Sequence, residues 1–488
     1  MGICNLNESN NVAKQSEVIA LFDKIKNFMK GVWHKLFPIS SIEKALNIKV
    51  ETDTTMSRAI ELWANMYENK PPWLSDTVSS MNLPASIANE TARLVTLELE
   101  SEVTGSSRGD YLNEQYQKVI ENIRTYTEYA CAKGGLVFKP YVDDAAINIE
   151  YVQADYFYPV KYGSDGSITA AAFVEQKQVG ETTYTRLEYH DFDGTKETIT
   201  NKAYKSKFKD SLGTEISLEE VEEWKDLQPT ACIENIERPM FAYFKIPIAN
   251  NVDTYSPLGA SIFSRAVELI KEADKQYSRC LWEYESAERA VDVDVTAFKR
   301  DQFGNPVVPQ GKDRLFRTID AEADGKTFYE VFSPDIRDVS FHAGLNRILR
   351  LIEFNCGLAY GTISDPEVDA RTATEVKQSK QRSYSTVTDI QKALEKALDH
   401  LVYIMDVYAT LYNLAPKGNY ETSFKWDDSI VVDAEAERMQ DLQDIRDGLM
   451  PKYAYRMKWY GEDEATARKV IEEIEGADKS DDEILGFK

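Results

Sequence analysis

The 488-residue sequence is short of the features that mark exported, membrane-spanning and zinc-binding proteins. Its five cysteines are scattered, odd in number and without the paired spacing of a zinc site or a disulfide framework: Cys4, Cys131, Cys232, Cys280 and Cys356. No run of about twenty apolar residues occurs, so we expect no segment to span a bilayer. Leu6 stands where a myristoylation signal needs Ser or Thr, and no secretory h-region follows. We therefore expect a reducing compartment and no export.

Positive charge is also scarce. The chain has 57 Lys and Arg against 82 Asp and Glu, which gives a formal net charge of −25. Proteins that hold a nucleic acid over a broad surface gain affinity by releasing counterions through clustered Lys and Arg. The composition argues against such a surface, so we expect any DNA contact to be local or loose. Hydrophobic residues make up 43% of the chain, which is enough for a folded core.

Catalytic and metal-binding motifs are missing as well. The four histidines, at positions 34, 190, 342 and 400, are too far apart for a local metal motif, and no HExxH, GxSxG or GxGxxG pattern occurs. We predict no catalytic residue, no metal site and no cofactor.

One pattern leaves an enzymatic alternative open. Asp365 or Asp369, followed by Glu375 and Lys377, has the spacing of many Mg²⁺-dependent nucleases, in which paired carboxylates hold the metal. Those nucleases carry the Glu-x-Lys on a β-strand. Here Glu375 ends the capping box Thr372–Glu375, which predicts the start of a helix. A Mg-dependent nuclease is therefore the less favoured interpretation.

The N-terminal half combines helical and strand patterns. Apolar residues from Val18 to Phe37 recur at helical spacing with lysines between them, which predicts a basic amphipathic helix. We expect it to pack on the parent domain or on a neighbouring subunit, and a membrane surface is the alternative. Further helices are predicted at Met56–Tyr67, Leu83–Val103 and Tyr111–Ala132. Strands are predicted at Gly134–Phe138, Ile147–Val152, Ile168–Gln176 and Tyr184–His190, with hairpin turns at Asp165-Gly166 and Asp193-Gly194.

Two helices separated by a small β segment are predicted next. Ser256-Pro257 has the chemistry of a helix N-cap followed by proline, and the helical pattern continues to about Ala290. A second Ser-Pro start, Ser333-Pro334, opens a helix that ends near Gly357 and Gly361. The strands expected between the two helices are Val291–Val295, Leu315–Thr318 and Phe328–Phe332.

The capping box Thr372–Glu375 opens a helix of roughly forty residues, about 60 Å long at 1.5 Å per residue. Its apolar residues form a heptad-like stripe, which indicates packing against other helices: Val387, Ile390, Leu394, Ala397, Leu401, Ile404, Tyr408 and Leu411. A strand-like segment at Thr422–Val432 and short acidic helices from Ala434 onward follow.

The order helix, small β insertion, antiparallel helix, loop and long helix resembles the stem, clip, stem, tunnel loop and channel helix of phage portal proteins. Nearly the whole chain takes part, and the order and spacing of several segments carry the resemblance. They are Gly134–Pro140, Val152–Pro159, Asn250 with Ser256–Ile262, Thr372–Val376 with Tyr384 and Val387, and Gly448–Lys452 with Gly461-Glu462. The chain looks similar to the portal type common in siphoviruses of Gram-positive hosts.

This resemblance implies an α+β portal fold with a mixed α/β wing, two antiparallel stem helices, a small clip insertion, a long channel helix and a helical C-terminal crown. The implied parts are the wing (1–255), stem helix one (256–290), the clip (291–332), stem helix two (333–361), the tunnel loop (362–371), the channel helix (372–412), a return strand to the wing (413–433) and the crown (434–488).

The resemblance also implies a function that is not enzymatic. The chain would form a ring of twelve copies at one capsid vertex, a head–tail connector through which double-stranded DNA passes during packaging and ejection. An acidic lining would let phosphates slide. The implied partners are the terminase large subunit, the head–tail adaptor, the scaffolding protein and the major capsid protein, with no membrane. The implied location is the virion, and the host cytoplasm during assembly. The alternative is another phage assembly or virion structural protein.

Three groups of contact residues follow from the resemblance. The tunnel loop would touch the moving DNA through Thr362, Ile363, Ser364, Asp365, Pro366, Glu367, Val368, Asp369, Ala370 and Arg371. Basic residues after it in the channel are Lys377, Lys380 and Arg382, for which solvation or pairing between subunits is the structural alternative. The clip would offer the terminase or the adaptor Lys299, Arg300, Phe303, Asn305, Lys312 and Arg314.

Overall fold

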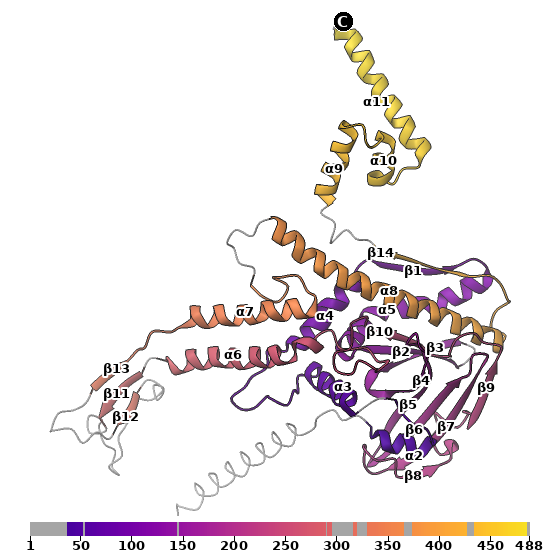
Figure 1. Ribbon diagram of the computed structural model, residues 1–488, viewed down its shortest axis with the longest axis vertical. Coiled ribbons are helices and arrows are strands. Elements are labelled where there is room, and N and C mark those ends of the chain that lie inside the picture. The colour runs from indigo at the N-terminus through magenta and orange to yellow at the C-terminus, as the bar shows by residue number, and fades with distance from the viewer. Residues whose placement is uncertain are drawn as a thin grey trace, which may run out of the picture. The chain divides into compact units, whose positions relative to one another are not determined.

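The computed structural model describes residues 37–51, 54–143, 146–288, 290–294, 316–319, 329–365, 373–426 and 434–485. The chain divides into two compact units, Met1–Phe424 and Lys425–Lys488. Helices and mostly antiparallel sheets make up the described residues, so the predicted α+β class is confirmed (Figure 1). None of the helices described is long and apolar enough to cross a membrane.

The described part of the first unit opens with helices α2 (Ile39–Leu46), α3 (Thr54–Tyr67), α4 (Leu83–Thr96) and, after a short strand, α5 (Ser107–Lys133). Helix α5 starts where the Ser106 side chain accepts a hydrogen bond from the Arg108 amide, and it ends at Gly134 with φ of 91°. The helices predicted at 56–67 and 111–132 are confirmed as α3 and α5. The basic amphipathic helix predicted at 18–37 lies outside the described residues, apart from Phe37.

The helix predicted at Leu83–Val103 is wrong at its C-terminal end. Residues Leu99–Thr104 form the strand β1, which pairs with β14 (Glu421–Trp426). Within β1 only Ser101 and Val103 are buried, so side chains alternate between the two faces of a strand. Ser101 Oγ donates to the carbonyl of Ser423, 322 positions away, at 2.8 Å. Because the partner strand is so distant in sequence, residues Leu99–Thr104 carry no local pattern that identifies them as a strand.

Two sheets follow α5. A three-stranded sheet has the order β10-β2-β3, and a larger sheet has the order β4-β5-β6-β7-β8 with β9 also paired to β7. The strands are β2 (Gly135–Asp143), β3 (Ala146–Gln153), β4 (Phe157–Tyr162), β5 (Ile168–Val179), β6 (Thr182–Phe192), β7 (Lys196–Ser206), β8 (Thr214–Ile216), β9 (Thr230–Glu234) and β10 (Ala242–Lys245). Gly166 and Gly194 have positive φ at the two predicted hairpin turns.

The helix predicted to begin at Ser256 begins later. Helix α6 spans Val267–Ser286 after a short 3-10 turn, η3 (Ser264–Ala266). The preceding residues, 256–263, are buried and form neither a helix nor a β-strand. The Ile262 amide donates to the carbonyl of Cys131 at 2.9 Å. Gly259 lies close to the backbone of Gly134. A Cβ added to Gly259 would lie 2.0 Å from the carbonyl oxygen of Gly134. Backbone packing against the end of α5 thus replaces the helix that the Ser-Pro pair predicts.

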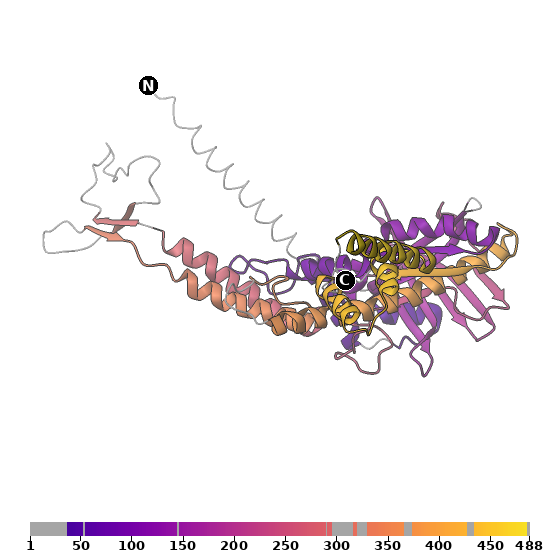
Figure 2. The same cartoon turned by 90° about the horizontal axis from the view of Figure 1, so that it is seen from above.

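Helix α7 (Asp338–Cys356) also starts later than its Ser-Pro pair predicts, and it ends as predicted at Gly357, with φ of 71°. Figures 1 and 2 show α6 and α7 side by side, forming a helical hairpin. The chain between them contains β11 (Ala290–Asp294), β12 (Phe316–Ile319) and β13 (Tyr329–Phe332) in a sheet of order β12-β11-β13. These strands confirm the small β insertion.

Helix α8 (Ala373–Leu411) has 39 residues, close to the predicted length. Its buried residues contact the β10-β2-β3 sheet as well as α4 and α5. From Val387 to Ile404 the heptad-like stripe therefore packs against both a sheet and helices, not against helices alone, whereas Leu411 at its end is 56% exposed. The capping residue Thr372 and the side chain of Glu375 lie outside the described residues.

Where the structure describes the second unit beyond Trp426, it contains the helices α9 (Ala434–Arg446), α10 (Lys452–Tyr460) and α11 (Glu464–Leu485). The turns between them contain Gly448 and Gly461, both with positive φ, as the sequence predicts. Among the side chains described in this unit, the buried apolar ones are Tyr455 and Ala467. Arg468 lies 3.9 Å from the centre of the Tyr453 ring, and Lys458 and the Trp459 indole both reach Asp441 at 2.7 Å.

Candidate functional site

The described residues include only part of the predicted contact regions. Thr362, Ile363, Ser364 and Asp365 are described, and Pro366 to Arg371 are not. Lys377 and Lys380 lie on α8, but their side chains are outside the described part, whereas the Arg382 side chain is inside it. The six residues predicted to dock the terminase or adaptor all lie outside the described residues: Lys299, Arg300, Phe303, Asn305, Lys312 and Arg314.

The start of the predicted DNA-contacting loop is held by one buried carboxylate. Glu353, on the last turn of α7, has 0% of its surface exposed. Its Oε1 accepts hydrogen bonds from the amides of Gly361 (3.1 Å), Ile363 (2.7 Å) and Ser364 (2.9 Å). Its Oε2 accepts a bond of 2.8 Å from Ser364 Oγ. Four donors of the loop therefore converge on one side chain of the helix.

A second side chain of α7 holds the next residue of the loop. The Asp365 amide donates to Asn346 Oδ1 at 2.8 Å, and Asn346 Nδ2 donates to the Asp365 carbonyl at 3.3 Å. Asn346 and Glu353 are seven residues apart, about two helical turns, so they lie on the same side of α7. Residues 361–365 thus run back along α7.

Arg382 links the start of α8 to the end of α7. Its guanidinium lies 4.4 Å from the centre of the Phe354 ring and 5.4 Å from that of Tyr360. A guanidinium over an aromatic face is attracted by the ring's electron density. The structure therefore places this predicted channel cation against two rings of its own subunit.

The free end of the α6–α7 hairpin is clamped by an ion pair. Arg337 donates to both carboxylate oxygens of Glu283, from Nε at 2.9 Å and from Nη2 at 2.7 Å. These bonds hold the pKa of the Glu283 carboxyl below its usual range. Tyr284 and His342 form a further contact between the helices, 3.0 Å from Oη to Nε2.

A strap between α3 and α4, residues 70–82, is hydrogen-bonded to the middle of α6 (Figure 1). Asp274 accepts hydrogen bonds from Trp73 Nε1 and from the Met81 amide, both at 2.8 Å. The Ser79 amide donates to Ser278 Oγ at 2.8 Å. Burial raises the pKa of the Asp274 carboxyl. The middle of α6 is therefore held by the segment between α3 and α4.

The hairpin exposes large apolar side chains to solvent in the single chain. The most exposed on each helix are Trp282 on α6, at 63%, and Val339 on α7, at 77%. Other apolar side chains that are at least two-fifths exposed on these helices are Leu281, Tyr284, Leu351 and Phe354. Together we call these six residues the stem apolar residues. Several large apolar side chains exposed on one hairpin favour contact with another molecule.

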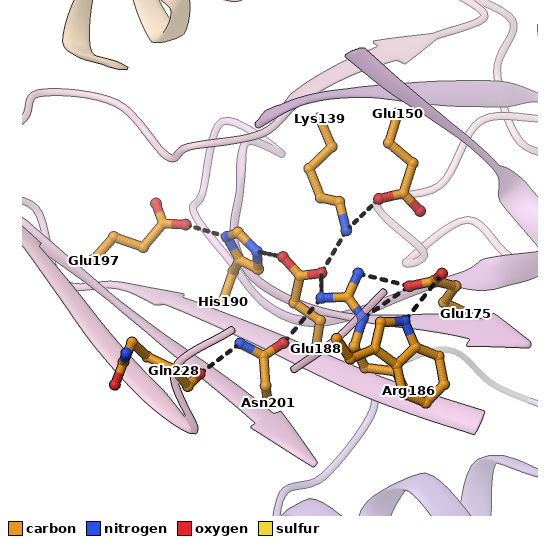
Figure 3. A network of polar contacts seen from close by, with 10 residues as sticks. Lys139, Glu150, Glu175, Arg186, Glu188, His190, Glu197, Asn201 and Gln228 are labelled. Atoms are coloured by element: carbon orange, nitrogen blue, oxygen red, sulfur yellow. Dashed lines mark hydrogen bonds and ion pairs between the residues drawn. The ribbon is translucent and has the colours of Figure 1, made fainter. Parts of the chain in front are cut away.

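A buried ionic network in the sheets was not predicted (Figure 3). His190 lies between the carboxylates of Glu188, at 2.7 Å from Nε2, and Glu197, which it contacts through Nδ1. Lys139 and Arg186 also contact Glu188, at 2.6 Å and 2.9 Å. Burial disfavours the imidazolium, but the carboxylates of Glu197 and Glu188 outweigh it and raise the pKa of His190 to about 9.

The sequence did contain a signal for this network. Arg186, Glu188 and His190 alternate along β6, so they share one face of the strand. Three ionisable residues on one face of a strand indicate either a solvated face or a paired buried network, and only the structure shows that they are buried. At its edges the network reaches the partly exposed carboxylates of Glu150, which pairs with Lys139, and Glu175, which pairs with Arg186.

No metal site is formed by the residues described: none of their His, Cys, Asp and Glu side chains gather in a group of three or more that could hold an ion. Asp369 and the side chains of Glu375 and Lys377, which the nuclease interpretation needs, lie outside the described residues. Beside the loop is an open depression of about 460 Å³ whose lining includes Thr362, Ile363, Ser86 and Glu128.

A family model described as "Phage portal protein, SPP1 Gp6-like" matches residues 58–483 of the chain. The matched range runs from α3 into α11 and includes the sheets, the helical hairpin and α8. No curated protein matches the chain significantly.

Proposed function

The chain belongs to the phage portal protein family of the SPP1 Gp6-like type, and from this premise we propose that it forms a closed ring of twelve subunits through which double-stranded DNA enters and leaves the capsid. The α6–α7 hairpin is the stem of each subunit, the β11–β13 insertion its clip, the loop that starts at residue 362 its tunnel loop, and α8 its channel helix. The second unit contains the crown.

The exposed stem apolar residues carry this proposal. Covering these side chains with a partner would stabilise the assembly by roughly 25 cal/mol for every Å² of apolar surface that is buried. The six residues lie on both helices of a hairpin that is itself clamped by the Glu283–Arg337 ion pair. In a ring each subunit offers one side of its stem to one neighbour and the other side to the next, a heterologous contact that closes. Neighbouring stems would thereby cover these side chains.

The net charge of the chain supports a channel through which DNA slides rather than a surface that binds DNA tightly. At a formal net charge of −25, a channel built from many copies would keep phosphate contacts short-lived. The tunnel loop would touch DNA by steric and local polar contact, with no covalent chemistry. Lys377 and Lys380 would add weak attraction, while Arg382 would act mainly by holding α8 to α7.

The partners follow from the position of a portal in the virion. The clip, with Lys299, Arg300, Phe303, Asn305, Lys312 and Arg314, would dock the terminase large subunit during packaging and the head–tail adaptor afterwards. The scaffolding protein and the major capsid protein would surround the ring at one vertex. The subunits would meet these partners in the host cytoplasm during assembly and remain in the virion.

Light scattering of full-length variants tests the role of the stem. Trp282→Asp and Leu351→Asp should each reduce the assembled fraction severalfold, because a charge would have to be buried between neighbours. Phe208→Asp is the matched control, since Phe208 is 68% exposed but lies outside the stem. The proposal fails if the wild-type chain is a monomer at all salt and protein concentrations. The stem assignment fails if Phe208→Asp is as disruptive as the two stem variants.

A further inference from the structure

We propose that Glu353 is a positioning residue that lays the start of the tunnel loop along the second stem helix and so fixes where the loop leaves the stem. Only the statement that this loop faces DNA rests on the proposed function. The positioning itself rests on the contacts between α7 and residues 361–365.

The burial of Glu353 has no explanation within α7 itself. The buried face of this helix contains Leu345, Leu349, Ile352 and Cys356, an apolar stripe of the kind that packs a helix. Glu353 follows Ile352 and is just as buried, at 0% exposure. A buried carboxylate is strongly unfavourable unless hydrogen bonds compensate it. All the hydrogen bonds that the structure shows for its carboxylate come from residues 361–364.

The loop in turn depends on Glu353 for its backbone conformation. Residues 361–365 form no helix or strand, so their amides have no regular partners. Three of these amides, from Gly361, Ile363 and Ser364, use the carboxylate oxygen Oε1. Without it they would have to find water or reorganise. The Gly361 amide also reaches Ser364 Oγ at 3.2 Å, and the Thr362 amide donates to the Ala359 carbonyl at 3.3 Å, so the helix side chain sets the conformation of this segment together with a local turn.

These contacts also fix the direction in which residues 361–365 run along α7. Glu353 binds residues 361–364, and Asn346, about two turns nearer the start of α7, binds Asp365, so the segment runs toward the N-terminal end of α7. The point at which the loop leaves the stem is thus tied to α7 near Asn346. A shift of α7 would carry the start of the loop with it.

Glu353 could act through its length or through its charge, and two variants separate these. Glu353→Gln keeps the length and one carbonyl acceptor for the three amides but removes the charge. Glu353→Asp keeps the charge but withdraws the carboxylate by one methylene. A positioning role requires Gln to be the better replacement, whereas an electrostatic effect on DNA phosphates requires Asp.

Hydrogen exchange of the full-length protein, followed by mass spectrometry, measures the contact directly. In Glu353→Ala and Glu353→Asp, exchange in the peptide covering 361–364 should accelerate by about tenfold or more, as expected when a hydrogen bond is lost. Glu353→Gln should stay much closer to wild type. Glu272→Gln is the matched control on α6, because its carboxylate is exposed and pairs only with Lys275 in the described structure.

The number of DNA-filled particles made by phage carrying each variant gives the functional readout. We expect normal ring assembly in all variants, near-normal filling with Glu353→Gln and at least tenfold fewer filled heads with Glu353→Asp. If Glu353→Ala does not fold, Asn346→Ala provides the second test, with faster exchange at Asp365 alone. Unchanged exchange in both Glu353→Asp and Asn346→Ala would overturn the inference. Absence of rings in the wild type would instead overturn the proposed function, while the exchange result would still stand.

Discussion

At the residue scale, the buried charges of the larger sheet join strands from separate parts of the first unit. Lys139 on β2 and Arg186 on β6 both contact Glu188, and Glu197 on β7 accepts a hydrogen bond of 2.6 Å from the Met240 amide. Each charge is matched by an opposite charge or by a backbone donor. Removing one member would leave its partner buried and unpaired, which costs more than the pair itself contributes.

His190 should make stability depend on pH. Its pKa is raised to about 9 in the folded chain, against about 6.5 when unfolded. Because the folded state binds the proton more tightly, the stabilisation is fully present below about pH 6.5 and is lost as the pH rises through about 9. We expect a loss on the order of 1–3 kcal/mol, measured as the difference in free energy of unfolding between wild type and His190→Gln. A difference that stays constant from pH 6 to about 9.5 would contradict this assignment.

Gly259 should tolerate no side chain. Its Cβ would lie 2.0 Å from the Gly134 carbonyl oxygen, which is a backbone atom that cannot move aside cheaply. We predict that Gly259→Ala lowers the free energy of unfolding by about 2–4 kcal/mol, measured by urea denaturation.

Gly344, inside α7, is the matched control for that substitution. The nearest atom to its added Cβ is Gln276 Nε2 at 3.7 Å, an ordinary contact. Gly344→Ala should therefore raise stability by about 0.5–1 kcal/mol through better helix propensity. Equal effects of the two alanines would show that the close approach of the two backbones is not a constraint.

At the element scale, long segments with a consistent pattern were predictable and their boundaries less so. Helices α3, α5 and α8 and strands β2, β3, β5 and β6 lie where their periodicities predicted. The starts of α6 and α7 were predicted too early, because a Ser-Pro pair marks a turn as readily as a helix start. At Ser256 tertiary contact with the end of α5 decides the conformation. Strand β1 was missed since its partner comes from the far end of the unit.

The strap over α6 should depend on Asp274. Its carboxylate accepts from both Trp73 and Met81, while Ser278 holds only the Ser79 amide. We predict that Asp274→Ala releases residues 73–81, with a local cost of about 1–3 kcal/mol from donors left without a partner. Chymotrypsin cleavage at Trp73 and Leu74 should accelerate clearly, and Ser278→Ala should have a smaller effect. Equal cleavage rates in wild type and Asp274→Ala would contradict this role.

At the scale of the whole molecule, the resemblance to portal proteins was predictable because it depends on the order of elements, and the family match confirms it. The anchoring of the loop was not predictable. Glu353 lies in a helical segment where a carboxylate usually faces solvent, and its loop partners follow after the helix has ended. Arg382 was predicted as a channel cation, and its aromatic contacts with Phe354 and Tyr360 become visible only when α7 and α8 are brought together.

The exposed stem apolar residues and the acidic composition support the proposed assembly, in which stems cover one another around a channel. Negative-stain electron microscopy of the purified full-length chain tests this most directly. The account predicts closed rings of about twelve subunits with a central hole, as expected for heterologous contacts that close. Single subunits or open filaments under all conditions of salt and concentration would contradict it.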